Sequence, residues 1–129
     1  MGKAKLILLV DDDRDFLELN RGVLAAAGYR VACFSDPEAA LGAAEGERPD
    51  LVVSDLMMKA LDSGFSLARA LKGRFPGLPV ILVTAASSQR GFNFSPRGRE
   101  DLAAMNADAF FDKPVAPAAL IAKVRDLLT

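Results

Sequence analysis

The sequence predicts an α/β fold built on a parallel sheet, and three observations carry the prediction. Apolar runs of strand length recur at 6–10, 29–34, 51–53, 80–83 and 109–111. Amphipathic segments at helical spacing separate most of these runs. The runs are almost continuously apolar, which is typical of strands that helices cover on both faces. A chain of 129 residues has room for one such domain with one core.

The first two helices are predicted from their ends. The first spans about 14–27, with Phe16 on its apolar face, and stops at Gly28, a residue suited to a helix C-terminal cap. The second begins within 35–38, where a serine, an early proline and a glutamate stand in the order favoured at helix starts.

The later helices are less evenly defined. The third is predicted over about 65–72, before Gly73, and the last begins near Pro117 with apolar residues at helical spacing. Between the fourth and fifth strands, helical character is confined to 100–105. We therefore expect an irregular segment ahead of that short helix.

Composition excludes several classes of function. The chain has 16 basic and 17 acidic residues, so no excess charge attracts nucleic acid or a membrane surface. It contains no histidine, which excludes histidine-based catalysis and histidine metal ligands. The single cysteine, Cys33, predicts a buried and inert thiol in a reducing compartment. No signal peptide or membrane-spanning run is recognisable, so a soluble cytoplasmic protein is expected.

Chemically competent side chains stand at the ends of the predicted strands. They are Asp11 and Asp12 after the first, Asp55 after the third, Thr84 after the fourth and Lys113 after the fifth. Parallel strands gather their carboxyl ends at one edge, where such sheets bind ligands. Clustered carboxylates repel unless a cation neutralises them, and ligands that offer only oxygen suit Mg²⁺. A hydroxyl and an ammonium group beside the metal could hold a phosphoryl group, with an aspartate as nucleophile.

Each of these residues also has a purely structural interpretation. An aspartate after a strand often caps the next helix, and this interpretation suits Asp13 or Asp15. Asp55 could lead into a helix, Thr84 could be an ordinary strand-end hydroxyl, and Lys113 could be a surface charge. The occurrence of all of them at successive strand ends favours a functional site.

The chain resembles the response-regulator receiver domain of two-component signalling over essentially its whole length. The matching motifs are Leu9–Asp12, Asp50–Met58, Val80–Ala85 and Asp112–Val115, in the family's order. The resemblance implies a flavodoxin-like, doubly wound sheet of five strands in the order 2-1-3-4-5. It also implies a signalling phosphoprotein rather than an enzyme. Because the last predicted helix reaches Thr129, we expect one receiver domain over 1–129 without an output domain.

The resemblance assigns the phosphoacceptor and the metal ligands. Asp55 is expected to accept a phosphoryl group from a histidine kinase or a histidine phosphotransfer protein. Asp12 is expected to bind Mg²⁺ directly, Asp11 mainly through water, and Met57 through its backbone carbonyl, with Asp55 completing the set. Asp13 is left outside the metal shell.

The resemblance also assigns a switch. Thr84 is expected to bond the phosphoryl oxygen and draw its loop inward, while Lys113 pairs with the phosphate. Phe110 matches an aromatic position whose rotamer follows the threonine, although plain core packing explains it equally well. Pro114 matches the family's cis-proline after the lysine.

Two departures concern the loop after Asp55. Lys59 stands where the family usually has proline, and 61–64 carries one residue more than the commoner pattern. This loop is therefore expected to differ in shape from that of the family.

Met57 and Ala86 occupy variable positions where polar side chains in relatives help to place the hydrolytic water. Neither can hydrogen-bond through its side chain, so a long-lived phosphoryl group is expected.

The segment Ser87–Arg99, SSQRGFNFSPRGR, enlarges the loop after the fourth strand. Thr84 and Lys113 are 29 positions apart, more than the resemblance implies. A surface loop is the simple interpretation, yet Phe92 and Phe94 favour docking on the domain or on a partner.

Two other functions remain open at this point. A pseudo-receiver would bind its partners without phosphorylation, and a haloacid-dehalogenase-like phosphohydrolase would use Asp11 as nucleophile. Under the receiver interpretation the partners are the phosphoryl donor and a downstream protein, with homodimer formation left open. The sequence does not decide whether the chain stands alone or is a fragment of a longer protein.

Overall fold

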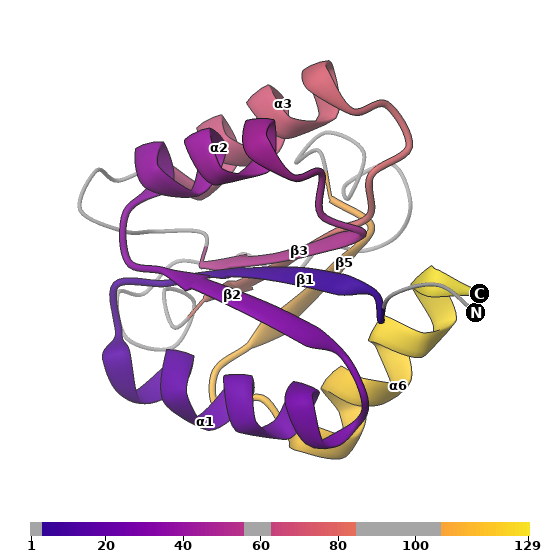
Figure 1. Ribbon diagram of the computed structural model, residues 1–129. Helices are drawn as coiled ribbons and strands as arrows, with labels where there is room; N and C mark the ends of the chain where they lie inside the picture. The colour runs from indigo at the N-terminus through magenta and orange to yellow at the C-terminus, as the bar shows by residue number, and fades with distance from the viewer. Residues whose placement is uncertain (1–3, 56–62, 85–106) are drawn as a thin grey trace.

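The structure is a computed structural model that describes residues 4–55, 63–84 and 107–129, with the backbone alone for 63–65. Strands and helices alternate along the chain (Figure 1). The elements are β1 (Leu6–Val10), α1 (Arg14–Ala26), β2 (Arg30–Phe34), α2 (Pro37–Gly46), β3 (Leu51–Asp55), α3 (Ser63–Arg74), β4 (Val80–Thr84), β5 (Ala109–Asp112) and α6 (Pro117–Leu128). The helix expected over 100–105 and the enlarged loop over 87–99 lie outside the described residues.

The strands form one parallel sheet in the order β2-β1-β3-β4-β5, as predicted. Chain order therefore reverses at β1: the chain first moves outward to β2 and then crosses back to β3. In open α/β sheets this reversal opens a crevice at the carboxyl ends of the strands. The topology places Asp11 and Asp12, which follow β1, beside that crevice.

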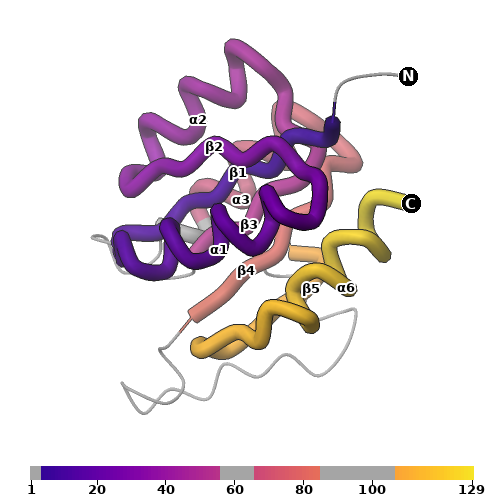
Figure 2. Tube along the Cα trace, turned by 60° about the horizontal axis from the view of Figure 1, so that its bottom comes forward, coloured from indigo at the N-terminus to yellow at the C-terminus, as the bar shows by residue number. Residues whose placement is uncertain are grey.

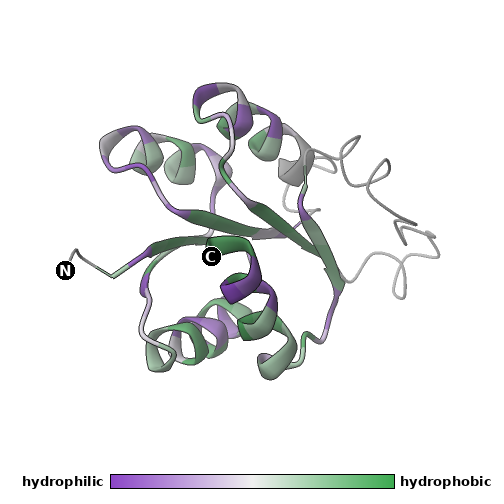
Figure 3. Cartoon of the chain, turned by 90° about the vertical axis from the view of Figure 1, so that its right-hand side faces the viewer, coloured by the Kyte–Doolittle hydropathy of each residue, from purple (hydrophilic) through white to green (hydrophobic). Residues whose placement is uncertain are grey.

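Helices cover both faces of the sheet, α2 and α3 on one and α1 and α6 on the other (Figure 1). Because successive strand residues point to opposite faces, each strand supplies both layers. Ile7 and Leu9 join the layer under α1 and α6, while Leu8 and Val10 join the layer under α2 and α3. The tube in Figure 2 shows α1 and α6 side by side, and Figure 3 shows mostly hydrophobic strands between helices that mix hydrophobic and hydrophilic residues.

The starts of α1 and α2 follow the predicted signals with one correction. Asp13 caps α1, and its side chain accepts hydrogen bonds from the backbone N–H groups of Asp15 and Phe16. The capping side chain of α2 is Asp36 rather than Ser35, because the Asp36 carboxylate reaches the backbone N–H of Ala39.

Four elements are longer than the sequence predicted, and one of them, β5, gains only Asp112. α3 begins at Ser63, two residues before the expected start, and runs through the predicted stop at Gly73. The glycine adopts helical backbone here because the residue itself does not force a helix to end. β3 and β4 extend to Asp55 and Thr84, so both residues are the last of their strands rather than residues beyond the strand ends.

Aspartates fix the amino-terminal edge of the sheet. The carboxylate of Asp50 accepts a hydrogen bond from the Leu6 N–H at 2.8 Å, and the Asp50 N–H donates to the Leu6 carbonyl. The carboxylate of Asp108 likewise accepts from the Val80 N–H at 2.8 Å, and the Asp108 N–H donates to the Val80 carbonyl. Lys72 Nζ lies 2.7 Å from the same Asp108 oxygen. Asp50, just before β3, and Asp108, just before β5, thus hold the start of the neighbouring strand in register.

Candidate functional site

Four strands deliver the predicted residues to one edge of the sheet. Asp11 follows β1, Asp55 ends β3, Thr84 ends β4 and Lys113 follows β5. The last two are joined directly, because the Lys113 N–H donates a hydrogen bond to the Thr84 carbonyl at 2.8 Å. The structure therefore brings together the residues that the sequence placed on separate strands.

Three carboxylates form the centre of this site. Asp11, Asp12 and Asp55 each offer one oxygen, and these oxygens all lie within 4.8 Å of one another. Asp11 is fully buried and Asp55 is 6% exposed, whereas Asp12 faces solvent. The Asp13 side chain caps α1, as one interpretation of the sequence suggested.

Lys113 supplies positive charge inside the acidic cluster. Its Nζ lies 2.7 Å from Asp11 Oδ2 and 3.7 Å from Asp55 Oδ2. The contact with Asp11 is therefore a close ion pair with a fully buried carboxylate. The other Asp11 oxygen accepts a hydrogen bond from the Asp13 N–H at 2.9 Å.

The Lys113 ammonium also lies over an aromatic ring. Its Nζ is 4.6 Å from the centre of the Phe16 ring, on the first turn of α1. The sequence analysis placed Phe16 only on the apolar face of this helix. The signal that could have drawn attention to it is its position on the first turn of the helix that follows the acidic pair, and therefore near the carboxyl edge of the sheet.

The acidic cluster is held at an electrostatic cost. Burial raises the pKa of Asp11 above its ordinary value, and the charge of Asp12 acts in the same direction. Lys113 and the Asp13 N–H oppose the rise in the pKa of Asp11 without cancelling it. Among the described residues, one ammonium group, that of Lys113, contacts three clustered carboxylates, so the cluster is suited to a cation. Its donors are all oxygen, which fits Mg²⁺ rather than a metal that prefers nitrogen or sulfur.

The predicted switch residues lie on adjacent strands. Thr84 is buried at the end of β4 and pairs in register with Asp112 of β5. Phe110 pairs with Leu82 and packs, partly buried, against the core layer under α2 and α3. Met57, the remaining predicted ligand, lies outside the described residues. The Lys113–Pro114 peptide bond is cis, as the resemblance implied.

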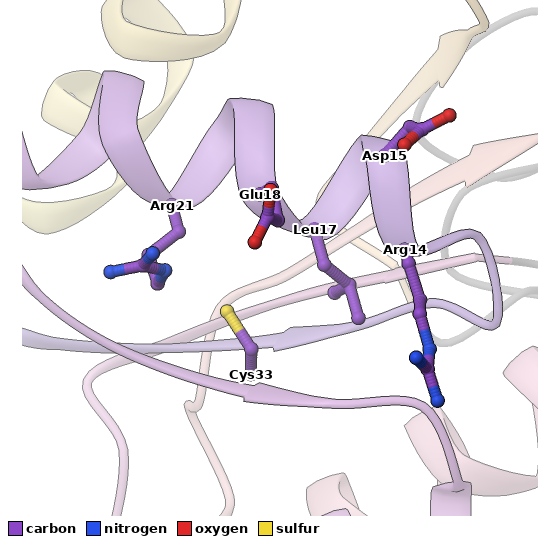
Figure 4. Close-up of a pocket in the computed structure, with 6 residues that line it drawn as sticks. All are labelled: Arg14, Asp15, Leu17, Glu18, Arg21 and Cys33. Atoms are coloured by element: carbon purple, nitrogen blue, oxygen red, sulfur yellow. The ribbon is translucent and has the colours of Figure 1, made fainter.

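A hollow lies between α1 and β2 (Figure 4). Cys33 on β2 is partly buried rather than fully enclosed as expected, and its sulfur points toward α1. Burial raises the pKa of the Cys33 thiol, and the positive charge of Arg21 partly opposes this effect. The residues that line the hollow are Arg14, Asp15, Leu17, Glu18, Arg21 and Cys33.

Fold and site together define a flavodoxin-like α/β protein with an acidic site at the carboxyl edge of its sheet. The sequence model of the family described as the response regulator receiver domain matches residues 7–125 of this chain. The chain belongs to this family, whose members are receiver domains of two-component response regulators.

Curated relatives agree with this assignment. The chain is 37% identical over 124 residues to the response regulator MprA of Mycobacterium tuberculosis, covering 95% of this chain and 50% of MprA. It is 35% identical over 124 residues to the alkaline phosphatase synthesis transcriptional regulatory protein PhoP of Bacillus subtilis, covering 96% of this chain and 48% of PhoP. The chain thus spans about half the length of these relatives.

Solved structures agree as well. A CheY-like receiver domain from Methanospirillum hungatei has a TM-score of 0.81 at 27% identity, with 97% of this chain and 94% of that chain covered. The receiver domain of DrrB, activated with BeF3, has a TM-score of 0.79 at 28% identity, with 97% of each chain covered. Membership of the receiver family leaves the dehalogenase-like interpretation of Asp11 without support. Within the described ranges, no helix has the length and apolar character needed to cross a bilayer.

Proposed function

We propose that the chain is a single receiver unit in which Asp55 accepts a phosphoryl group in a Mg²⁺-dependent reaction. The phosphoryl donor is a phosphohistidine of a sensor kinase or a phosphotransfer protein. One observation carries the proposal: three carboxylates offer oxygens within 4.8 Å of one another, and Lys113 inserts its ammonium group among them. Such a cluster is unfavourable for stability alone and is well suited to binding a cation and a phosphoryl group.

Asp55 is a better nucleophile than Asp11 on grounds of access. Asp11 is fully buried, and its two oxygens face the Asp13 N–H and the Lys113 ammonium group. Asp55 ends β3 at the crevice and retains 6% exposure. An incoming phosphorus atom needs an oxygen it can approach in line with the departing nitrogen.

The reaction transfers one phosphoryl group. An Asp55 carboxylate oxygen attacks phosphorus, the O–P bond forms as the N–P bond breaks, and the bonding pair returns to the imidazole nitrogen of the donor. Lys113 balances negative charge on the phosphoryl oxygens, and the Thr84 hydroxyl donates a hydrogen bond to one of them. Asp11, Asp12, Asp55 and the Met57 carbonyl would hold Mg²⁺, which when bound neutralises charge on the nucleophile and the phosphoryl group.

The proposed output is a change in partner binding. Movement of Thr84 toward the phosphoryl group would leave space for Phe110 on the neighbouring strand, and phosphorylation would thereby bias the protein toward its active state. The near balance of 16 basic and 17 acidic residues favours a downstream protein over direct contact with nucleic acid.

Phosphorylation by acetyl phosphate tests this function. With Mg²⁺, intact mass spectrometry should show one added phosphoryl group on the unaltered protein, and EDTA should prevent the addition. Asp55→Asn should lose all labelling, because the amide is a poor nucleophile. Asp13→Asn is the matched control: it changes a neighbouring aspartate outside the cluster, preserves a capping side chain, and should leave labelling intact.

Two results would contradict the proposal. Undiminished labelling of Asp55→Asn would remove Asp55 as the acceptor and revive Asp11 as a nucleophile. Absence of both labelling and Mg²⁺-dependent beryllofluoride binding in the unaltered protein would identify a pseudo-receiver.

A further inference from the structure

The contact between Lys113 and Phe16 has a geometry that attracts a cation. The distance of 4.6 Å from Lys113 Nζ to the ring centre lies well within the range over which the negative face of an aromatic ring attracts an ammonium group. The Lys113 side chain is 16% exposed, so water screens this attraction only in part. An aliphatic side chain could fill the same core position but would offer no such attraction.

Phe16 is held firmly enough to act as an anchor. It is 9% exposed and packs in the core layer under α1 and α6. Its backbone N–H donates to the Asp13 side chain at 3.4 Å, and its carbonyl accepts from Asn20 Nδ2 at 2.9 Å. Asn20 is itself 2% exposed, so this second bond is sheltered from water. The ring therefore presents its face from a fixed point on the first turn of α1.

The charged partners of Lys113 differ from the ring in one respect. Asp11 and Asp55 are also the carboxylates suited to bind a divalent cation. Once they are occupied by metal, they attract the Lys113 ammonium group less strongly. The Phe16 ring carries no net charge and takes no part in metal binding, so its attraction persists in the loaded site.

We propose that Phe16 is a positioning residue for Lys113, holding the ammonium group at the acidic cluster through a cation–π contact when metal and a phosphoryl group occupy the carboxylates. Without the ring, Asp11 still retains Lys113 in the metal-free protein, whereas in the loaded site Lys113 keeps its attraction to the phosphoryl oxygens but loses the ring as an uncharged anchor. Removing the ring should therefore weaken the loaded state more than the metal-free state. The consequence for phosphoryl binding rests on the function proposed above, whereas the contact itself does not.

The contact can be tested in the metal-free, unphosphorylated protein by NMR. A proton over an aromatic face is shifted upfield, so the ε-methylene protons of Lys113 should lie upfield of those of the other lysines. Lys113→Met identifies the signal by removing it, and Phe16→Leu should return it to the ordinary lysine position. An unshifted Lys113 signal in the unaltered protein would overturn the proposal, whether or not the chain is phosphorylated.

The positioning role can be tested with beryllofluoride and Mg²⁺ as the probe. Phe16→Leu should weaken beryllofluoride binding about fivefold, corresponding to about 1 kcal/mol for a partly desolvated cation–π contact. Phe16→Tyr keeps the aromatic face and should bind close to the unaltered level. Leu24→Val is the packing control, because it thins the same core layer about 12 Å further along α1.

The relative beryllofluoride affinities of the variants distinguish a cation–π contact from simple packing. If packing alone mattered, Phe16→Leu and Leu24→Val would behave alike, and Phe16→Tyr would be the worst variant because it adds a hydroxyl to a nearly closed site. That order would overturn the proposal. If Phe16→Leu does not fold, two measurements still test the proposal. They are the NMR shift of the Lys113 ε-methylene protons in the unaltered protein and the beryllofluoride affinity of Phe16→Tyr. Failure of the unaltered protein to bind beryllofluoride would instead count against the proposed phosphoacceptor function.

Discussion

Asp11 is a carboxylate that the fold keeps entirely from solvent. Its pKa is raised chiefly by burial, so its charged form is disfavoured even with Lys113 2.7 Å away. A structural ion pair placed for stability would be expected to leave no such surplus of negative charge, because unbalanced buried charge is costly. Binding of a cation would offset the cost of burying the negative charge of Asp11. The burial of this one residue is therefore an argument for a functional site.

Cys33 gives a prediction that depends on pH. Burial raises the pKa of its thiol, so at any pH below that pKa the folded protein has less reactive thiolate than the unfolded chain. Alkylation by iodoacetamide should be slower in the folded protein, with the midpoint of its pH–rate curve above that of the urea-unfolded protein. Arg21→Gln should raise the midpoint further, because the positive charge of Arg21 lowers the thiol pKa. A midpoint equal to that of the unfolded chain would show that the thiol is effectively solvated.

At the scale of elements, the start of β1 depends on a side chain that precedes β3. Asp50→Ala would leave the Leu6 N–H without the carboxylate it contacts at 2.8 Å. We expect a loss of about 1–3 kcal/mol in the free energy of unfolding, the usual cost of a partly buried donor without a partner. Urea unfolding followed by circular dichroism measures the loss.

Asp50→Asn is the control for that substitution. Its amide oxygen can still accept the Leu6 N–H, so it should retain most of the stability. An equal loss for both variants would mean that the charge of Asp50, rather than its hydrogen bond, stabilises the strand.

The elements also show where local sequence signals succeed. β1 and the start of α6 were predicted at the observed residues because a continuous apolar run and an early proline act within a few residues. The bounds of α3 were wrong, since a glycine signals a helix end only where the surrounding packing permits one. The extension of β3 to Asp55 likewise depends on its neighbour, because Asp55 pairs with Val83 of β4.

At the scale of the whole molecule, one sheet separates two core layers. Ile7 belongs to the layer under α1 and α6, and Leu71 to the layer under α2 and α3. Ile7→Val should cost about 1 kcal/mol and Leu71→Ala about 3 kcal/mol of unfolding free energy. Their effects should add to within about 0.5 kcal/mol in the double variant, because the two side chains share no partners across the sheet.

Chemical denaturation of the two single variants and the double variant tests this expectation. A single cooperative transition is expected in each case. A large departure from additivity would mean that the two layers are coupled through movement of the sheet itself.

The sequence by itself determined the fold class, the strand order implied by the family motifs, and the residues at the carboxyl edge. It could do so because each motif is local and a parallel sheet brings all carboxyl ends to one side. The tertiary structure alone decided that Lys113 pairs most closely with Asp11, that Phe16 faces the same ammonium group, and that Asp50 and Asp108 hold neighbouring strands. The residues joined by these contacts are between 28 and 102 positions apart in the sequence, and Phe16 and Lys113 are 97 positions apart. No local sequence pattern spans such separations, so the contacts follow only from the folded structure.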